Sequence, residues 1–248
     1  MDLNLTLPDL SGRTIVVTGA SRGIGWNAAV ALGAAGAHVI AIARTVGALE
    51  ELDDAIRAKG GSATLVPLDL KDLDAIDRLG LSIYERWGKL DGLLGNAGLL
   101  GLITPLTHLD QKEWDAVFMV NVTANYRLIR SLDPLLQRSD AGRALFLSSG
   151  AVDKCRPFWG VYSASKAALE ALVRTYAAEI ASTSVRANLF EPGPLRTQMR
   201  AKARPGEDPA TLQHPSAVAP DIVRMLAPDF ADNGTRFDFP TGAVKRFL

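Results

Sequence analysis

The sequence predicts an α/β fold in which helices cover both faces of a parallel sheet. Short β-rich runs alternate along the chain with longer stretches rich in alanine and leucine, a pattern typical of βαβ units. The apolar runs lack a clean alternation of apolar and polar residues, as expected for strands buried on both faces. The chain has 248 residues and no evident linker, so we expect a single domain spanning residues 1–248.

Each expected strand is a short apolar run, often β-branched, that ends at glycine, proline or a polar turn. These runs occupy residues 13–20, 38–44, 62–70, 90–98, 143–150, 184–193 and 235–240. Each expected helix is a longer stretch with helical spacing of apolar residues. These stretches occupy residues 24–37, 47–61, 73–87, 111–138 and 160–180, the fourth interrupted by Asp133 and Pro134. Residues 194–220, rich in proline and charge, are either a plain solvated loop or a lid over a pocket.

The composition excludes several classes of protein. Lysine plus arginine and aspartate plus glutamate both number 27, so the chain has no basic surplus for a nucleic-acid backbone. Cys155 is the only cysteine, which excludes an intramolecular disulfide, and three scattered histidines predict no metal site. The acidic start is not a secretory signal and no apolar run is long enough to span a membrane. We therefore expect a cytoplasmic protein.

The segment TGASRGIG, residues 18–25, carries the first chemical motif. It follows a predicted strand and opens a predicted helix, with Gly19, Gly23 and Gly25 in the turn. Glycines allow a sharp turn and a close approach of the backbone to a pyrophosphate, and the helix N-terminus offers unpaired N–H groups. The segment therefore predicts a dinucleotide-binding turn; a tight glycine turn without a ligand is the alternative.

The end of the second predicted strand indicates which dinucleotide is bound. In such folds an acidic residue there binds the ribose hydroxyls of NAD, whereas an arginine accommodates the 2′-phosphate of NADP. Ala43 takes the acidic position, Arg44 follows it, and Arg22 in the glycine turn is a second cation. Two guanidinium groups without an opposing carboxylate favour a phosphate, which predicts NADP(H) over NAD(H).

Tyr162 and Lys166 stand one turn apart in the helix expected at residues 160–180. Taken alone, the pair fits an ordinary amphipathic helix with a half-buried tyrosine and a solvated lysine. An ammonium beside a phenol also favours the phenolate. At about 4 Å and an effective dielectric of about 20 the attraction is about 4 kcal/mol, which predicts that Lys166 lowers the pKa of Tyr162 by about three units.

Six motifs, in this order along the chain, resemble those of the short-chain dehydrogenase/reductase family. They are TGASRGIG, Asp69 in PLDL, GNAG at residues 95–98, Asn121 with Ser149, YSASK at residues 162–166 and PGPLRT at residues 192–197. Asn121 and Ser149 precede Tyr162 by 41 and 13 residues, the family's usual offsets. The likeness extends from about residue 10 to residue 200 and implies a Rossmann-like domain with about seven parallel strands.

The resemblance also implies hydride transfer between NADP(H) and a carbonyl compound or an alcohol. Tyr162 is then the general acid/base, tuned by Lys166, and Ser149 donates a hydrogen bond to the substrate oxygen. Asn121 holds a water that connects Lys166 to solvent. The cofactor residues implied are Gly19, Ser21, Arg22, Gly23, Ile24, Gly25, Arg44, Asp69, Leu70, Asn96, Ala97, Gly98, Tyr162, Lys166, Pro192, Gly193, Leu195 and Thr197.

The substrate is expected to be a small carbonyl compound or alcohol, and its identity stays open. Candidate pocket residues are Ser149, Val152, Phe158, Trp159 and Met199, although structural packing is an equal alternative for the two aromatic ones. Retention of tyrosine, lysine, serine and asparagine favours an enzyme. The alternative is a catalytically silent regulator or scaffold that binds the dinucleotide.

Two features depart from the family pattern. Gly95 stands where asparagine is usual, which leaves the rigidity of this segment open. The C-terminal segment lacks the usual Gly-Gly. Its apolar residues Phe237, Phe239, Phe247 and Leu248 either bury at a subunit interface or cap the core. The resemblance implies a homo-oligomer, a tetramer or dimer.

Overall fold

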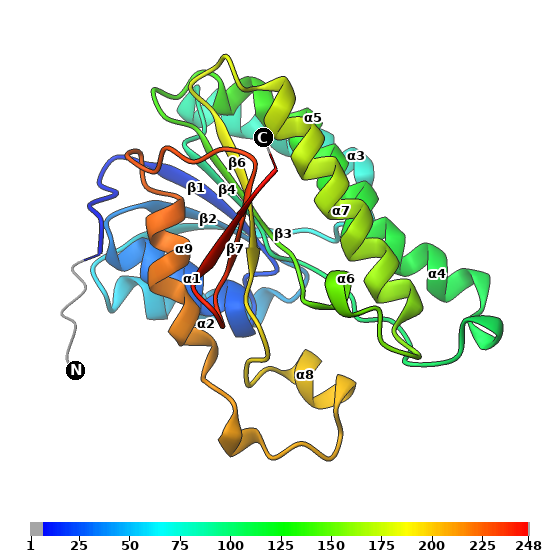
Figure 1. Cartoon of the computed structure of the whole chain (residues 1–248). Helices are drawn as coiled ribbons and strands as arrows, with labels where there is room; N and C mark the ends of the chain where they lie inside the picture. The colour runs from blue at the N-terminus through cyan, green and yellow to red at the C-terminus, as the bar shows by residue number, and fades with distance from the viewer. Residues whose placement is uncertain (1–6, 248) are drawn as a thin grey trace.

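The computed structural model describes residues 7–247. Within this range the chain forms one sheet of eight strands (Figure 1). The strands are β1 (Thr14–Thr18), β2 (His38–Ala43), β3 (Ser62–Pro67), β4 (Gly92–Gly95), β5 (Arg143–Leu147), β6 (Arg186–Glu191), β7 (Thr235–Asp238) and β8 (Ala243–Arg246). Their order across the sheet is β3-β2-β1-β4-β5-β6-β7-β8. All neighbours pair in parallel except β7 and β8. This arrangement confirms the predicted α/β class.

Helices cover both faces of the sheet. They are α1 (Gly23–Ala34), α2 (Val46–Arg57), α3 (Leu73–Trp87), α4 (Gln111–Phe118), α5 (Ala124–Leu136), α6 (Ala151–Lys154), α7 (Gly160–Glu179), α8 (Gln198–Ala203) and α9 (Ala219–Met225). Figure 1 shows α1, α2 and α9 on one face and α3, α5 and α7 on the other. The molecule is therefore a three-layer α/β/α structure.

Strand β1 shows why both faces are covered. Ile15 and Val17 pack into the core beneath α1, whereas Val16 between them packs into the core beneath α3 and α5. None of the three side chains is exposed. Because successive side chains of a strand point to opposite faces, a run without polar residues requires a layer of helices on each side.

The sequence predicts about seven strands, and the structure adds an eighth. All residues of β8 are exposed, so no apolar run marks this strand in the sequence. It forms because the chain turns back after β7, where the N–H of Gly242 donates to the carbonyl of Asp238 at 2.8 Å and Gly242 has a φ of +70°. The resulting hairpin places an antiparallel strand at the edge of the sheet.

The helix predicted at residues 111–138 is interrupted at another place than expected. A π-helical turn, η2 (Met119–Thr123), separates α4 from α5. Pro134 lies inside α5, two residues before its end, so the missing N–H removes only one hydrogen bond. Asp133 accepts hydrogen bonds from the Gln137 amide and the Tyr176 hydroxyl, both at 2.7 Å, and these keep the last turn in place. The predicted break at Asp133 and Pro134 is therefore wrong.

Residues 194–220 are more ordered than a plain solvated loop. They contain α8 and two short 3-10 helices, η3 (Pro209–Thr211) and η4 (Pro215–Val218). Leu195 pairs with Gln213 in an isolated parallel bridge, and the guanidinium of Arg200 pairs with the carboxylate of Glu207. The segment thus folds back on itself; its role as a lid stays a prediction.

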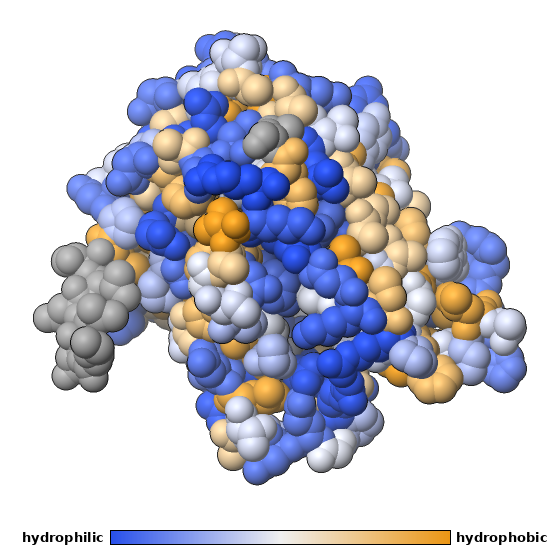
Figure 2. Space-filling model, in the orientation of Figure 1, coloured by the Kyte–Doolittle hydropathy of each residue, from blue (hydrophilic) through white to orange (hydrophobic). Residues whose placement is uncertain are grey.

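The aromatic residues of the C-terminal segment cap the core. The ring centroids of Phe237 and Phe239 lie 5.6 and 6.4 Å from that of Phe190, and Phe247 packs against the core on the other face. Leu248 and the acidic start of the chain, residues 1–6, lie outside the described residues. Figure 2 shows a largely hydrophilic surface in this orientation. Between residues 7 and 247, no helix has the length and apolar character needed to cross a membrane.

Candidate functional site

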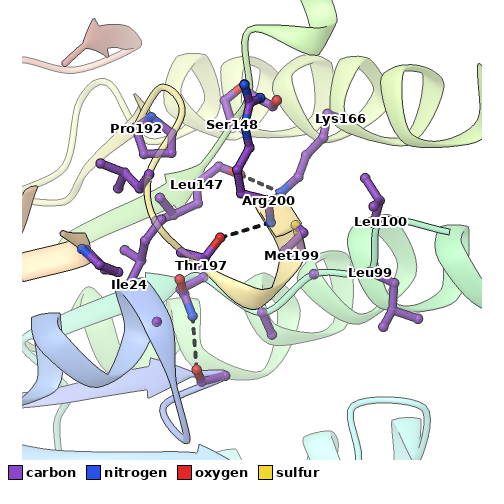
Figure 3. A pocket seen from close by; sticks show the side chains of 18 of the residues that line it. Ile24, Leu99, Leu100, Leu147, Ser148, Lys166, Pro192, Thr197, Met199 and Arg200 are labelled. Atoms are coloured by element: carbon purple, nitrogen blue, oxygen red, sulfur yellow. Dashed lines mark hydrogen bonds between the residues drawn. The ribbon is translucent and has the colours of Figure 1, made fainter. Parts of the chain in front are cut away.

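A cavity of about 860 Å³ opens at the carboxyl ends of the strands (Figure 3). Its wall is formed by the segments that follow β1 to β7, together with residues of α7 and α8. The strand order reverses at β1, since β2 lies on one side of it and β4 on the other. Open α/β sheets bind ligands at such a reversal, because the loops on either side of it diverge and leave a crevice.

The glycine turn closes the cavity beyond β1. Gly19 and Gly23 have φ angles of +66° and +60°, a conformation that favours glycine. A Cβ atom on Gly25 would lie 2.4 Å from the carbonyl oxygen of Gly19, so α1 approaches the turn too closely for a side chain. Helix α1 has no side-chain cap and no acidic residue in its first turn. Its first N–H groups therefore fit the pyrophosphate of a dinucleotide.

The two predicted phosphate-binding arginines lie at the adenosine end of the cavity wall. Arg44 is exposed and forms no ion pair or side-chain hydrogen bond with residues 7–247. Arg22 donates to the Gln198 side chain at 2.9 Å, which places a second guanidinium in this wall. Asp69 accepts a hydrogen bond from the N–H of Lys71 at 3.0 Å. No acidic residue replaces Ala43 at the end of β2, so the wall fits a 2′-phosphate.

The segment after β4 is held by strand β1. Asn96 donates its side-chain amide to the carbonyl of Thr18 at 2.8 Å, and the N–H groups of Asn96 and Ala97 donate to the Thr18 hydroxyl at 3.0 and 3.1 Å. A Cβ atom on Gly95 would lie 2.3 Å from Cδ1 of Phe146. The aromatic ring on β5 thus fills the space of a side chain at position 95, which explains the glycine.

The structure brings Tyr162, Lys166 and Ser149 together at the other end of the cavity. Tyr162 and Lys166 are 7% and 4% exposed, and both lie in the cavity wall on α7. Ser149 lines the same end of the cavity, and its side chain lies close enough to the Tyr162 hydroxyl to lower the pKa of the phenol. Lys166 donates from Nζ to the carbonyl of Leu147 at 2.7 Å (Figure 3). A phenol, a hydroxyl and an ammonium therefore converge on one place.

Burial has the largest effect on the pKa values of Tyr162 and Lys166. It raises the pKa of Tyr162 above 10.0, against the hydrogen bond from Ser149, and the negative charge of Glu191 acts in the same direction as burial. It lowers the pKa of Lys166 from 10.5 to about 8, against the charge of Glu170. The expected lowering of the Tyr162 pKa by Lys166 is therefore wrong. Helical spacing shows which groups share a face, whereas the pKa of the phenol is set chiefly by the loss of water around it.

Asn121 lies behind the cavity wall rather than in it. Its buried side chain in η2 accepts from the N–H of Leu99 at 2.7 Å and donates to the Leu99 carbonyl and the Ser165 hydroxyl, both at 2.9 Å. Leu99 is a wall residue and Ser165 precedes Lys166. Asn121 thus fixes two neighbours of the site, and its holding of a water stays a prediction.

Most of the predicted site residues line the cavity. They are Gly19, Ser21, Arg22, Gly23, Ile24, Arg44, Asp69, Leu70, Asn96, Ala97, Gly98, Ser149, Trp159, Tyr162, Lys166, Pro192, Gly193, Leu195, Thr197 and Met199. Trp159 and Met199 pack beside Tyr162 in a small apolar cluster with Leu100 and Ala151. These side chains form an apolar boundary at the tyrosine end of the cavity.

Four predicted residues do not line it: Gly25, Asn121, Val152 and Phe158. Phe158 is 55% exposed, and both it and Cys155 adopt positive φ angles, of 73° and 39°. Val152 and Phe158 do not reach the cavity, whereas Asp153, Lys154 and Arg156 between them do line it. The expected places of Val152 and Phe158 in the substrate pocket are therefore wrong.

Sequence reasoning missed several wall residues, among them Leu100, Lys154 and Glu191. Glu191 had a recognisable signal, because it places a charge at the buried end of an apolar strand directly before the PGPLRT motif. Leu100 and Lys154 had no such signal in the sequence, because apolar residues after strands and lysines on short helices are common in proteins of any function.

Comparison with known proteins agrees with this geometry. A family model described as short chain dehydrogenase matches residues 13–208. The chain is 36% identical over 237 residues to the uncharacterized oxidoreductase YciK of Escherichia coli K12, covering 94% of each protein. The short chain dehydrogenase of Shigella flexneri has a TM-score of 0.90 at 36% identity, covering 96% of this chain and 94% of that one. A chain from Escherichia coli CFT073, complexed with NADPH, has a TM-score of 0.89 at 38% identity, with 93% and 97% covered. By its sequence and its fold alike, the chain belongs to the short chain dehydrogenase family of oxidoreductases.

Proposed function

We propose that the chain interconverts a small carbonyl compound and an alcohol with NADP(H), and that Tyr162 carries the proton. The observation that carries this proposal is the placement of Ser149 and the buried Tyr162 and Lys166 in the cavity that also contains the glycine turn and Arg44. A protein that only bound the dinucleotide would have no need for a phenol, a hydroxyl and a buried ammonium in the same cavity.

The cavity wall offers the groups that NADP(H) requires. The uncapped N–H groups of α1 suit the pyrophosphate, and Arg44 and Arg22 suit the 2′-phosphate. At the far end, Gly193 and Thr197 belong to the segment that faces Lys166 across the cavity. When bound, NADP(H) supplies the hydride for reduction and accepts it for oxidation.

Tyr162 supplies the proton in the reducing direction. Because burial raises its pKa, the phenol is protonated at neutral pH and able to donate to a carbonyl oxygen as negative charge develops there. The Ser149 hydroxyl, which lines the same cavity, donates a hydrogen bond to the same oxygen and stabilises the charge that develops there. The apolar cluster around Tyr162 excludes water and strengthens both interactions.

Lys166 supplies positive charge for the reverse direction. With a pKa of about 8, its amine is mostly protonated at pH 7. One N–H is engaged by the Leu147 carbonyl, and the other two are available on the cavity side. The ammonium favours the phenolate that remains after Tyr162 has given up its proton.

Replacing Tyr162 by phenylalanine tests the proposal directly. We expect Tyr162→Phe to lose carbonyl-dependent NADPH oxidation by about 100-fold or more, because the proton donor is removed while the ring stays in place. The affinity for NADPH, measured by fluorescence titration, should stay within about threefold of the wild-type value.

Tyr176→Phe is the matched control, since Tyr176 is another buried tyrosine of α7 whose hydroxyl contacts Asp133 far from the cavity. It should retain turnover. Substantial reductase activity in Tyr162→Phe would contradict the assigned role. NADPH binding by the wild type without turnover of a broad panel of aldehydes, ketones and alcohols would favour a dinucleotide-binding regulator.

A further inference from the structure

Glu191 is a buried carboxylate for which the proposed chemistry has no role so far. It ends strand β6, is 6% exposed and lines the cavity. Burial raises its pKa above 4.5, because water no longer solvates the charge. Carboxylates are rarely buried unless they are paired or hydrogen-bonded, so the groups that hold Glu191 indicate what it does.

One oxygen of Glu191 holds two separate segments of the wall. Oε1 accepts hydrogen bonds from the N–H of Gly150 at 2.8 Å and from the N–H of Gly193 at 3.0 Å. Gly150 directly follows Ser149, and Gly193 belongs to the turn that leads from β6 into α8. A single carboxylate oxygen therefore ties the segment that carries Ser149, after β5, to the turn that follows the neighbouring strand β6.

The other oxygen faces no protein donor. Among residues 7–247, no group donates a hydrogen bond to Oε2. Lys154 attracts the carboxylate and Asp238 repels it, and no lysine, arginine or histidine among residues 7–247 lies within ion-pair distance of Glu191. The negative charge of Glu191 is thus not neutralised locally, and it acts on the neighbouring phenol of Tyr162.

We propose that Glu191 is a positioning residue that fixes the Ser149–Gly150 segment against the Pro192–Gly193 turn and that also contributes a negative charge to the cavity wall that contains Tyr162. The first part needs only the acceptor oxygen, whereas the second needs the charge. The second part rests on the proposed function, because it concerns the proton that Tyr162 transfers; the first part does not.

Two substitutions separate the parts. Glu191→Gln retains an acceptor oxygen for both N–H groups and removes the charge, whereas Glu191→Ala removes both. We expect Glu191→Ala to weaken NADPH binding by about tenfold or more, because two buried N–H groups lose their partner and the wall loosens. Glu191→Gln should bind NADPH within about threefold of wild type. Fluorescence titration measures both affinities.

The charge is tested by the pH profile of kcat/KM between pH 6 and 10. In Glu191→Gln, the part of the profile that is governed by ionisation of the Tyr162 phenol should move to lower pH by about half a unit or more. The reason is that a nearby negative charge no longer opposes formation of the phenolate. The other charged groups near this end of the wall, Asp153, Lys154, Arg156, Lys166 and Asp238, together with Glu170 behind Lys166, are unchanged in that variant. Glu179→Gln, at the exposed end of α7, is the control and should leave both affinity and profile unchanged.

The results distinguish this role from simple packing. Equal losses in Glu191→Gln and Glu191→Ala with no shift of the pH profile would overturn the proposal, as would wild-type NADPH affinity in Glu191→Ala. If the wild type turns over no substrate, the proposed function fails, and the NADPH affinities of the two variants still decide whether Glu191 fixes the wall. If Glu191→Ala does not fold, Glu191→Asp replaces it, because the shorter side chain cannot reach both N–H groups.

Discussion

The ammonium of Lys166 is buried, and burial lowers its pKa from 10.5 to about 8. In the unfolded chain the amine regains its ordinary pKa, so between these values the unfolded state binds more protons than the folded one. Stability is therefore reduced below about pH 8 and increases as the pH rises from about 8 to 10.5. The full difference corresponds to about 3 kcal/mol, which is the approximate free energy that this functional group costs the fold.

We expect Lys166→Met to raise the free energy of unfolding at pH 7 by about 1 to 3 kcal/mol, because it removes a buried charge. The gain falls short of the full value since the Leu147 carbonyl loses its hydrogen bond. Urea unfolding at pH 7 and pH 9.5 measures the effect, which should be smaller at the higher pH. Lys202→Met, on the exposed surface of α8, should change stability by no more than about 0.5 kcal/mol. A destabilised Lys166→Met variant with unchanged pH dependence would contradict this account.

Arg44 is the residue on which the cofactor preference depends most. Arg44→Asp should weaken NADPH binding by about tenfold or more and strengthen NADH binding, because a carboxylate repels the 2′-phosphate and accepts hydrogen bonds from the ribose hydroxyls. Fluorescence titration with both dinucleotides measures the ratio. Lys59→Asp introduces the same change of charge outside the cavity wall and should leave the ratio unchanged. An unaltered preference in Arg44→Asp would assign the selectivity to other residues.

The residues that sequence alone identifies are those whose chemistry leaves few alternatives. Gly19 and Gly23 are recognisable because other residues rarely adopt their positive φ angles, and Tyr162 with Lys166 because their spacing suits a proton transfer. The sequence could not show whether the pKa of Tyr162 is raised or lowered from its ordinary value. It depends on how much water reaches the phenol, and that is decided by side chains from several elements rather than by the neighbours along the helix.

The order of the strands and helices was predictable because each buried strand is a compact apolar run and each helix carries a periodic apolar face. The break between α4 and α5 was not. Pro134 is the stronger sequence signal, yet it lies where the helix ends anyway, whereas η2 contains no glycine or proline. The hydrogen bonds of Asn121 to Leu99 and Ser165 hold this π-helical turn, so the break is set by contacts distant in the sequence.

The strand β7 connects the C-terminal part of the molecule to the functional site. Its buried Arg236 donates to Glu170 of α7 at 2.9 Å and to Asp153 of α6 at 2.6 Å, and Glu170 also accepts a hydrogen bond from the hydroxyl of Ser148. Glu170 lies one helical turn beyond Lys166 on the same helix. A network of charges thus joins elements that are far apart along the chain behind the cavity.

Removing one member of this network should destabilise the whole molecule. We expect Arg236→Met to lower the free energy of unfolding by about 3 kcal/mol, because the buried carboxylate of Glu170 loses its ion-pair partner. The double variant Arg236→Met with Glu170→Leu should recover part of this loss, since no unpaired charge remains. Arg246→Met breaks an exposed ion pair with Asp232 and should change stability by about 1 kcal/mol or less. Urea unfolding measures the stability of the two single variants and the double variant. Equally small effects of Arg236→Met and Arg246→Met would contradict the importance of the buried ion pair between Arg236 and Glu170.

This network also affects how the protein matures during its synthesis. The ribosome releases the glycine turn and the tyrosine helix well before Arg236 has been translated. Until then Glu170 lacks the arginine that pairs with it, and the sheet ends at β6 instead of continuing to β7. A nascent chain arrested before residue 236 therefore carries every residue of the proposed chemistry but lacks the guanidinium that stabilises their support.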